Sequence, residues 1–362
     1  MGAFTGKLKS NLIFAALFNM IISQQVFADN VKGTYSKLVD EARVDGGMYG
    51  DTKLYYSTDA LKSYDWLNDE EAQNLLKLYR PKDPECQEIN IDVFRQIPLT
   101  LDNYLTKQAW ATEGAFSNFN SVMMGWIRIT KKIYDASTYN TFIGSVVADT
   151  QEVKEIEVNP SNYPTLGQGL GEVIANLLID MSKVSRKYND YKMIRSYDSS
   201  DLKFIWNAKY INQVKKIDLP ALFHNEGLVD KFAEDVLPED YFHDTLNTTT
   251  KTTADADTRS AIEQDIKLAD NTTEHFFAGM EIPVGTTLVS GGQIIVPSYQ
   301  VNKNIICKVI GKGAVPYMSG FEVATSFFNP KSLTETHYLT YGHNTLESLK
   351  DKPIVTIKLT EE

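Results

Sequence analysis

A long amphipathic segment, from Thr100 to about Ile143, constrains the fold of this chain more than any other part of its sequence. Thr100 and Asp102 follow a proline and can serve as helix N-caps. Beyond them, mostly apolar residues recur at spacings of three and four, which places them on one helical face. These residues are Phe116, Phe119, Val122, Met123, Trp126, Ile127, Thr130, Ile133 and Tyr134. A helix from Asp102 to Asp135 would be roughly 50 Å long, so the sequence predicts a rod longer than a small domain is wide.

The length and charge of the chain limit the classes of protein to which it can belong. With 362 residues, of which 43% are apolar and 23% charged, it can bury the core of one large or two modest domains. Its net charge of −11 argues against a simple nucleic-acid-binding protein, which needs a basic face for phosphates. A local basic patch is still compatible with that charge. Arg128, Lys131 and Lys132 lie off the apolar face of the long helix, where they would meet solvent or a polyanion.

The first 30 residues have two interpretations. Lys7 and Lys9 precede an apolar run over residues 12–22, and the sequence VFA at residues 26–28 is typical of a signal-peptidase site. The segment is therefore either a secretory signal or an apolar N-terminal arm that packs on another subunit. A transmembrane anchor does not fit, because an apolar run of about eleven residues is well short of the roughly 20 that a bilayer requires.

Residues 31–98 form an extended excursion in this interpretation. Glycine-rich turn signals flank a strand over Lys53–Tyr56, and Glu88–Ile97 alternates as a second strand. A short helix is predicted over Glu70–Leu78. These elements have few apolar residues for a core of their own. The excursion must therefore rest either on a partner subunit or on the body of the same chain.

The second half of the chain changes from helix to strand. Val153–Val158 reads as a strand, a second amphipathic helix opens at Gly167 and extends its apolar face to Val184, and Leu202–Trp206 reads as a buried strand. A tract rich in Thr, Ala and Asp over residues 245–258 is predicted to be an exposed loop. Six strands are predicted beyond Ile282. They are Thr287–Val289, Gln293–Val296, Ile305–Ile310, Glu322–Phe328, Thr336–Tyr341 and Ile354–Leu359.

No residue pattern in the chain indicates catalysis, a cofactor or a metal. The five histidines lack metal-ligand spacing, and His337 and His343 share a face only if one strand runs unbroken through Gly342. The glycines at 167–171 lack the residues of a phosphate-binding loop. Two cysteines are too few for a disulfide framework, and unpaired thiols are the favoured interpretation. We therefore predict that the chain is not an enzyme and has no catalytic, cofactor or metal residues.

The order of the predicted elements resembles that of the major capsid proteins of tailed bacteriophages, whose fold was first described for the phage named Hong Kong 97. Three stretches carry the resemblance. Tyr104–Trp110, continuing to Trp126, looks like the spine-helix region of small tailed-phage coat proteins. Leu202–Tyr210 resembles the strand, turn and helix of their axial domain, and Pro316–Gly342 resembles their closing strands.

The resemblance implies an α+β fold with an N-terminal arm, an extended hairpin loop, a long spine helix in a peripheral domain, and a mixed axial domain. The arm would comprise residues 1–30, and the extended loop with its flanking strands residues 31–98. The spine helix and peripheral domain would span residues 99–165. The axial domain would span residues 166–280, including the exposed loop at 245–258, and a strand-rich return to the peripheral domain would follow over 281–362.

The same resemblance implies a structural protein of the virion that assembles in the host cytoplasm. Such a chain forms the hexamers and pentamers of an icosahedral head around double-stranded DNA, together with scaffolding, portal and decoration proteins, and away from any membrane. It predicts contacts between subunits at Leu12, Phe14, Phe18, Ile21, Tyr55, Tyr56 and Trp66, and an inner-surface basic patch at Arg128, Lys131 and Lys132. The alternative is a secreted or periplasmic binding or surface protein with a signal peptide at residues 1–28.

Overall fold

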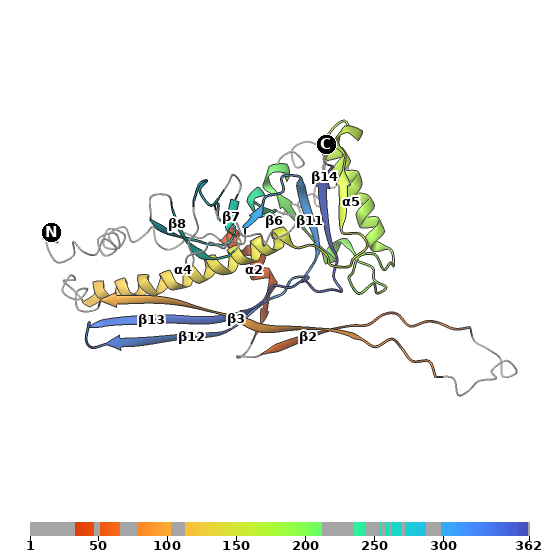
Figure 1. The fold of residues 1–362 in the computed structure, drawn as a ribbon. Helices are drawn as coiled ribbons and strands as arrows, with labels where there is room; N and C mark the ends of the chain where they lie inside the picture. Colours follow the sequence, from red (N-terminus) through yellow and green to blue (C-terminus); the bar gives the residue numbers. More distant parts are fainter. Residues whose placement is uncertain are drawn as a thin grey trace.

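A long helix lies along a long, twisted sheet in the computed structural model of the chain, and a second sheet stands at one end of both (Figure 1). The structure describes residues 33–46, 51–65, 78–102, 113–211, 235–242, 253–254, 258–260, 262–268, 272–286 and 298–360. Side chains are described over the same ranges, with the exception of residues 33–34, 45, 102–124 and 298–300. None of the described helices is both long and apolar enough to span a membrane.

The long helix α4 runs from Glu113 to Ser145. Its 33 residues correspond to roughly 50 Å, the predicted length, but it begins later than predicted. Thr100 and Asp102 are not N-caps, because they lie in the strand β3, Glu85–Asp102, where Asp102 pairs with Thr334. Leu101 is 1% exposed on this strand, so a strand period, and not a helical one, buries the apolar residues just after Pro98.

The long sheet has the strand order β1-β12-β13-β3-β2. Its other strands are β1 (Arg43–Asp45), β2 (Thr52–Ser57), β12 (Tyr317–Asn329) and β13 (Thr334–Asn344). All neighbours are antiparallel except β1 and β12. Ile127 and Tyr134 of α4 pack on Leu339 and Tyr341 of β13, which fixes the helix on the sheet. The predicted hairpin strands and two of the predicted late strands are thereby confirmed.

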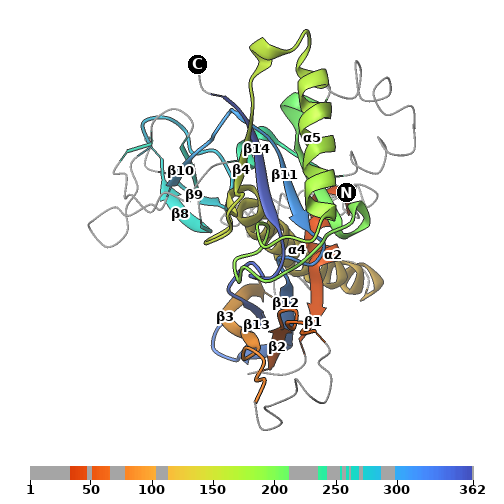
Figure 2. The ribbon, with the colours of Figure 1, turned by 90° about the vertical axis from the view of Figure 1, so that its right-hand side faces the viewer.

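The second sheet has the order β4-β14-β11-β5-β6, and both of its faces are covered. Its strands are β4 (Glu155–Val158), β5 (Leu202–Asn207), β6 (Asp235–Leu237), β11 (Ile305–Gly311) and β14 (Ile354–Leu359). Helix α5, Leu166–Ser182, lies against one face (Figure 2), where it meets Phe204 and Trp206. Helix α2, Gly33–Ala42, and the end of α4 cover the other face, where they meet Ile205 and Ile310. Alternate residues of β5 therefore serve two cores.

Helix α5 begins where the sequence predicts and ends earlier. The Thr165 hydroxyl accepts a hydrogen bond from the Gln168 amide and caps the first turn. Lys183 has an extended backbone that stops the helix. Val184 was expected on the apolar face but is 70% exposed, because it lies beyond the last helical turn.

A small lobe with two short ladders lies beside α4. It contains β7 (Thr258–Ser260) paired with β10 (Ser298–Gln300), and β8 (Gln264–Lys267) paired with β9 (Thr273–Phe276). The predicted exposed loop over 245–258 is wrong for Ala254 and Thr258, both of which are buried. Thr258 pairs with Gln300, and its carbonyl accepts a hydrogen bond from the Ile282 amide. Both partners are far from Thr258 in the sequence, so the local composition did not reveal its burial. The strands predicted at 287–289 and 293–296, and the helix predicted at 70–78 except for its last residue, lie outside the described residues.

Three single-turn 3-10 helices, Pro160–Asn162, Ser199–Asp201 and Glu239–Tyr241, complete the described elements. The second sheet combines β4, from before residue 166, with β5 and β6 and with β11 and β14, from after residue 281. Between β11 and β14 the chain leaves for β12 and β13 of the long sheet and then returns. Segments that are contiguous in sequence therefore do not correspond to single sheets.

Candidate functional site

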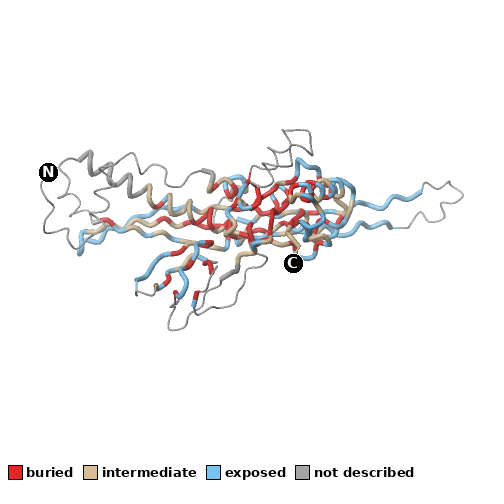
Figure 3. The backbone as a smooth tube through the Cα atoms, turned by 90° about the horizontal axis from the view of Figure 1, so that it is seen from above, coloured by how far each residue is buried: buried red, intermediate tan, exposed pale blue. Residues whose placement is uncertain are grey.

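The hairpin of β2 and β3 is the first candidate contact surface, because it projects from the long sheet with most of its residues exposed (Figure 3). Leu54 and Tyr56 are 50% and 65% exposed. Tyr55 points to the opposite face of the strand and packs against the cluster that contains Ile89 and Leu349. Both tyrosines were predicted to contact another subunit. The ring of Tyr56 is exposed to solvent, whereas the ring of Tyr55 packs against residues of its own chain.

The base of this hairpin is fixed to the body of the chain. Asp59, just after β2, accepts hydrogen bonds from the amides of Ile194 and Ala60, each at 2.9 Å, and from Arg186 at 2.7 Å. The Ile194 amide and the Arg186 guanidinium lower the pKa of Asp59 to about 2. On β3, the Gln87 side chain donates to the Ser348 carbonyl at 2.9 Å. The hairpin thus leaves the body in a defined direction.

A second candidate surface is the outer edge of β12. Its ladder with β1 ends at Ser319, and among the described strands nothing pairs with this edge from Gly320 to Asn329. Val323, Phe327 and Phe328 are 40%, 62% and 51% exposed. An open edge with apolar side chains is a template for pairing with another chain. These residues were not predicted as contacts from the sequence. Adjacent phenylalanines in a strand face opposite sides of the sheet, and here both sides leave the ring exposed.

Trp66 and the four arm residues predicted to contact other subunits, Leu12, Phe14, Phe18 and Ile21, lie outside the described residues.

The predicted basic patch divides into residues with different surroundings. Arg128 is exposed and Lys132 is partly exposed. Lys131 is only 12% exposed, and its ammonium group lies 3.2 Å from Asp135 and 3.8 Å from Glu322. Its charge is therefore already balanced within the chain.

Asp135 is the centre of a buried polar cluster that joins three elements. It is 1% exposed and accepts hydrogen bonds from the Tyr317 hydroxyl at 2.7 Å, Arg43 at 3.1 Å and Lys131 at 3.2 Å. These donors come from β12, β1 and α4. A buried carboxylate is tolerated only when it is paired in this way. The cluster therefore holds the helix, the first strand and the long sheet together.

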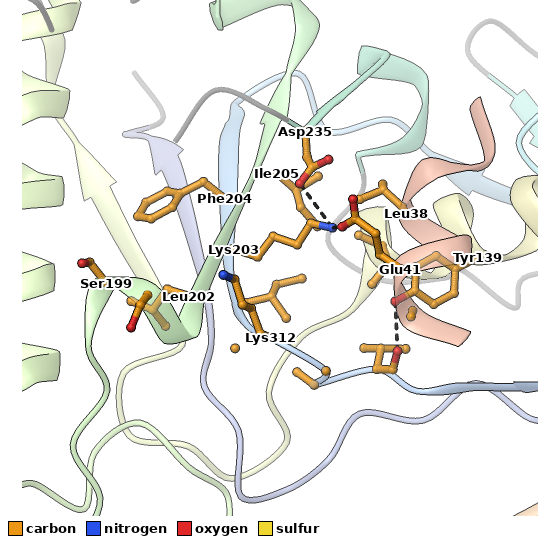
Figure 4. A pocket seen from close by; sticks show the side chains of 18 residues that line it. Leu38, Glu41, Tyr139, Ser199, Leu202, Lys203, Phe204, Ile205, Asp235 and Lys312 are labelled. Atoms are coloured by element: carbon orange, nitrogen blue, oxygen red, sulfur yellow. Dashed lines mark hydrogen bonds and ion pairs between the residues drawn. The ribbon is translucent and has the colours of Figure 1, made fainter. Parts of the chain in front are cut away.

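A cavity of about 550 Å³ lies between α2, the end of α4, β5 and β11 (Figure 4). Its floor is apolar, and its polar wall is made by Lys203, which lies between Glu41 and Asp235 and is 3.2 Å from the latter. Tyr139 donates to the Val315 carbonyl at 2.9 Å across the floor. The ion pairs leave the wall nearly neutral, and the lining includes no histidine or cysteine. The cavity thus combines an apolar floor with charged side chains that are paired within the chain.

Metal-ligating side chains do not cluster in the described part of the chain. Its His, Cys, Asp and Glu residues form no group of three or more that could hold a metal ion. Both cysteines are free, as predicted. Cys307 is buried in β11, and burial raises the pKa of its thiol, which keeps it protonated and unreactive.

The comparisons with known proteins found one protein family and similar folds in solved phage structures. The sequence model described as "Phi29-like phage major capsid protein" matches residues 6–355. The capsid structure of Staphylococcus phage Andhra matches with a TM-score of 0.62 at 13% identity, over 93% of this chain and 87% of that one. A chain in the structure of the head fiber and inner core protein gp22 of native bacteriophage P68 matches with a TM-score of 0.55 at 12% identity, over 88% of this chain and 83% of that one. No curated protein matches the sequence.

Proposed function

The chain belongs to the family of Phi29-like phage major capsid proteins, and from that premise we propose that it assembles into the hexamers and pentamers of an icosahedral head that encloses double-stranded DNA. The chain has the fold of tailed-phage capsid proteins, and its role in the virion is structural. The family match supports this proposal over the alternative of a secreted binding or surface protein.

The exposed hairpin of β2 and β3 is the observation that carries the proposal of assembly. Its two strands leave the body of the chain and expose Leu54 and Tyr56. A monomer gains little from such a projection, whereas a subunit in a closed shell can lay it on a neighbour. The fixed base at Asp59 and Gln87 supports this role, because a pre-oriented element loses less entropy when it binds.

The open edge of β12 provides a second, different surface on the same subunit. Contact between two different surfaces is heterologous, and heterologous contacts generate rings when the rotation between subunits closes. Hexamers and pentamers are such rings. The combination of a projecting hairpin and an open apolar edge therefore fits ring formation better than a two-fold dimer.

We assign the long sheet and α4 to the peripheral domain, and α5 with the second sheet to the axial domain. The boundaries at 165/166 and 280/281 serve as approximate limits, because β4, β11 and β14 contribute to the second sheet from outside 166–280. Arg128 and Lys132 on α4 are the proposed contacts with packaged DNA, held by charge and without sequence specificity. Scaffolding, portal and decoration proteins are further proposed partners, and assembly takes place in the host cytoplasm.

Light scattering of the purified full-length chain, followed by negative-stain imaging of the large species, tests the proposal. Assembly predicts shells on the order of tens of nanometres across, or rings of five and six subunits. A monodisperse monomer at all protein concentrations and salt conditions, alone and in lysates of infected cells, would contradict it.

The N-terminal segment is proposed to be an assembly arm. The family match begins at residue 6 and so includes the apolar run that contains Leu12, Phe14, Phe18 and Ile21. Deleting residues 2–28 is expected to leave soluble, folded subunits that do not form shells. Circular dichroism checks folding, and light scattering checks assembly; normal shells from the truncated chain would disprove the role of the arm.

A further inference from the structure

His343 lies where the chain passes between the two five-stranded sheets. Strand β11 of the second sheet leads into β12 of the long sheet, and β13 leads back into β14. His343 is near the end of β13, is 4% exposed, and stacks on the ring of Tyr317 at 5.5 Å. Strand β13 runs unbroken from Thr334 through Gly342, so His337 and His343 lie on one face, but His337 is farther from this crossing.

A directional chain of hydrogen bonds passes through His343. The Arg95 guanidinium donates to the Tyr134 hydroxyl at 3.2 Å, and that hydroxyl is 2.9 Å from Nε2 of His343. Nδ1 of His343 lies 2.8 Å from the Asn344 carbonyl oxygen, which can only accept, so Nδ1 carries the proton. Nε2 of the neutral ring is then the acceptor for Tyr134. Each donor in this series of hydrogen bonds, from Arg95 to the Asn344 carbonyl, has an acceptor only while His343 is neutral.

We propose that His343 is a protonation-controlled latch between α4 and the long sheet, closed when the imidazole is neutral and released when it is protonated. A proton on Nε2 turns this atom into a donor facing the Tyr134 hydroxyl. That hydroxyl would then receive two donors, from Arg95 and His343, and its own proton would lose its acceptor. Protonation also adds a positive charge near Arg95 within a buried site. The contact between Tyr134 of α4 and the end of β13 therefore weakens.

Some of the charged groups around His343 raise its pKa, and others lower it. On α4, Asp135 favours the protonated ring, but its charge is compensated by Lys131 and by Arg43 of β1. On β3, Asp92 favours protonation and Arg95 opposes it. The remaining titratable neighbours are Tyr134, the hydroxyls of Tyr317 and Tyr341, and Glu263, which pairs with Arg95 at 3.5 Å.

Burial sets the sign of the pH dependence. It lowers the pKa of His343 below the ordinary value of 6.5, despite the opposing effects of the Asn344 carbonyl and Asp135. A depressed pKa in the closed state means that the latch is fully stable above about pH 6.5 and weakens as the pH falls below that value. If the closed state excludes the proton, the opening equilibrium rises up to about thirty-fold between pH 7.5 and pH 5.

Hydrogen–deuterium exchange of the full-length chain, followed by mass spectrometry and corrected for intrinsic rates, tests the latch. In the wild type, peptides from residues 125–145 and 334–344 are expected to lose protection by up to about thirty-fold between pH 7.5 and pH 5. His343→Gln should remove this dependence. His337→Gln is the matched control on the same strand face and should retain it. The proposal fails if His343→Gln keeps the full acid response, or if His337→Gln abolishes it.

A second measurement needs no variant and holds even if His343→Gln does not fold. Exchange of the imidazole C2 hydrogen reports the protonation of each histidine in the wild-type chain. Protonation of His343 and loss of protection in the peptides of α4 and β13 should share one midpoint, below pH 6.5. Two separate midpoints would show that another group drives the change.

Discussion

Asp135 is a buried carboxylate that three donors from three elements hold in place. Tyr317 donates at 2.7 Å, and the charges of Arg43 and Lys131 lie 3.1 Å and 3.2 Å away. Removing a charge of this kind leaves two cations in a low-dielectric site without their partner. These three contacts with Asp135 therefore prevent α4, β1 and β12 from shifting independently.

The variant Asp135→Asn should lower the free energy of unfolding by about 3 kcal/mol, because it leaves Arg43 and Lys131 without their buried anion. Urea denaturation of soluble subunits measures the loss. Asp40→Asn is the matched control: Asp40 pairs with the same Arg43 but is 52% exposed, so less than about 1 kcal/mol is expected. Equal losses in both variants would disprove the role of burial.

A buried or partly buried side chain is hydrogen-bonded at one end of α4 and another at the start of the projecting hairpin. Lys308 of β11 is fully buried, and its ammonium donates to the Val146 carbonyl at 2.7 Å, just beyond the last turn of α4. A cation there satisfies a carbonyl at the helix end and interacts favourably with the helix dipole. Asp59 holds the start of the hairpin through the Ile194 amide and Arg186.

The variant Lys308→Met should destabilise the chain by about 1–3 kcal/mol, because the Val146 carbonyl loses its donor while the aliphatic packing is kept. The expected site of the loss is the last turn of α4, where amide exchange should accelerate most. Lys312→Met, at an exposed position just after the same strand, is the control and should change stability by less than about 0.5 kcal/mol.

The variant Asp59→Asn should release the base of the hairpin without unfolding the body. The pKa of Asp59 is depressed to about 2, so its stabilisation is complete above its unfolded value near 3.8 and is lost only as the pH falls toward 2. At neutral pH the Ile194 amide should exchange about fivefold faster in the variant, a loss of about 1 kcal/mol for a partly exposed group. Asp65→Asn, at an exposed position farther along the hairpin, should leave that amide unchanged.

The described part of the molecule has two different exposed surfaces, the hairpin and the open edge of β12. Both belong to the same sheet, whose strand order places β2 at one edge and β12 next to the short strand β1 at the other. A shell built through these surfaces would continue hydrogen bonding from one subunit to the next. Assembly, and not subunit stability, should therefore respond to changes at the exposed edge.

The variant Phe327→Lys should block shell formation and leave the melting temperature of the subunit nearly unchanged, because Phe327 is 62% exposed and contributes little to the core. Light scattering measures assembly, and thermal unfolding measures stability. Phe327→Leu keeps an apolar side chain on the edge and should assemble like the wild type. Shells formed by Phe327→Lys would remove this edge from the assembly contacts.

Local periodicity predicted much of the fold. The apolar face of α4 from Ile127 onward, the hairpin strands and the strand at Ile354–Leu359 follow from alternation or from spacings of three and four residues. The error at Thr100 has the same origin, because a strand pattern and a helical pattern meet there and only pairing with β13 decides between them. For the candidate surfaces, sequence reasoning identified Tyr56 but missed the exposed pair Phe327 and Phe328.

The sequence by itself determined the class of most of the long elements, since the period of apolar residues depends only on neighbours along the chain. The order of its elements also indicated the capsid-protein fold. Only the tertiary structure decided which strands share a sheet, that Thr258 is buried, that Lys131 pairs with Asp135, and that His343 meets Tyr134. Those features depend on contacts between residues that are far apart in the sequence, and a pattern of near neighbours does not contain them.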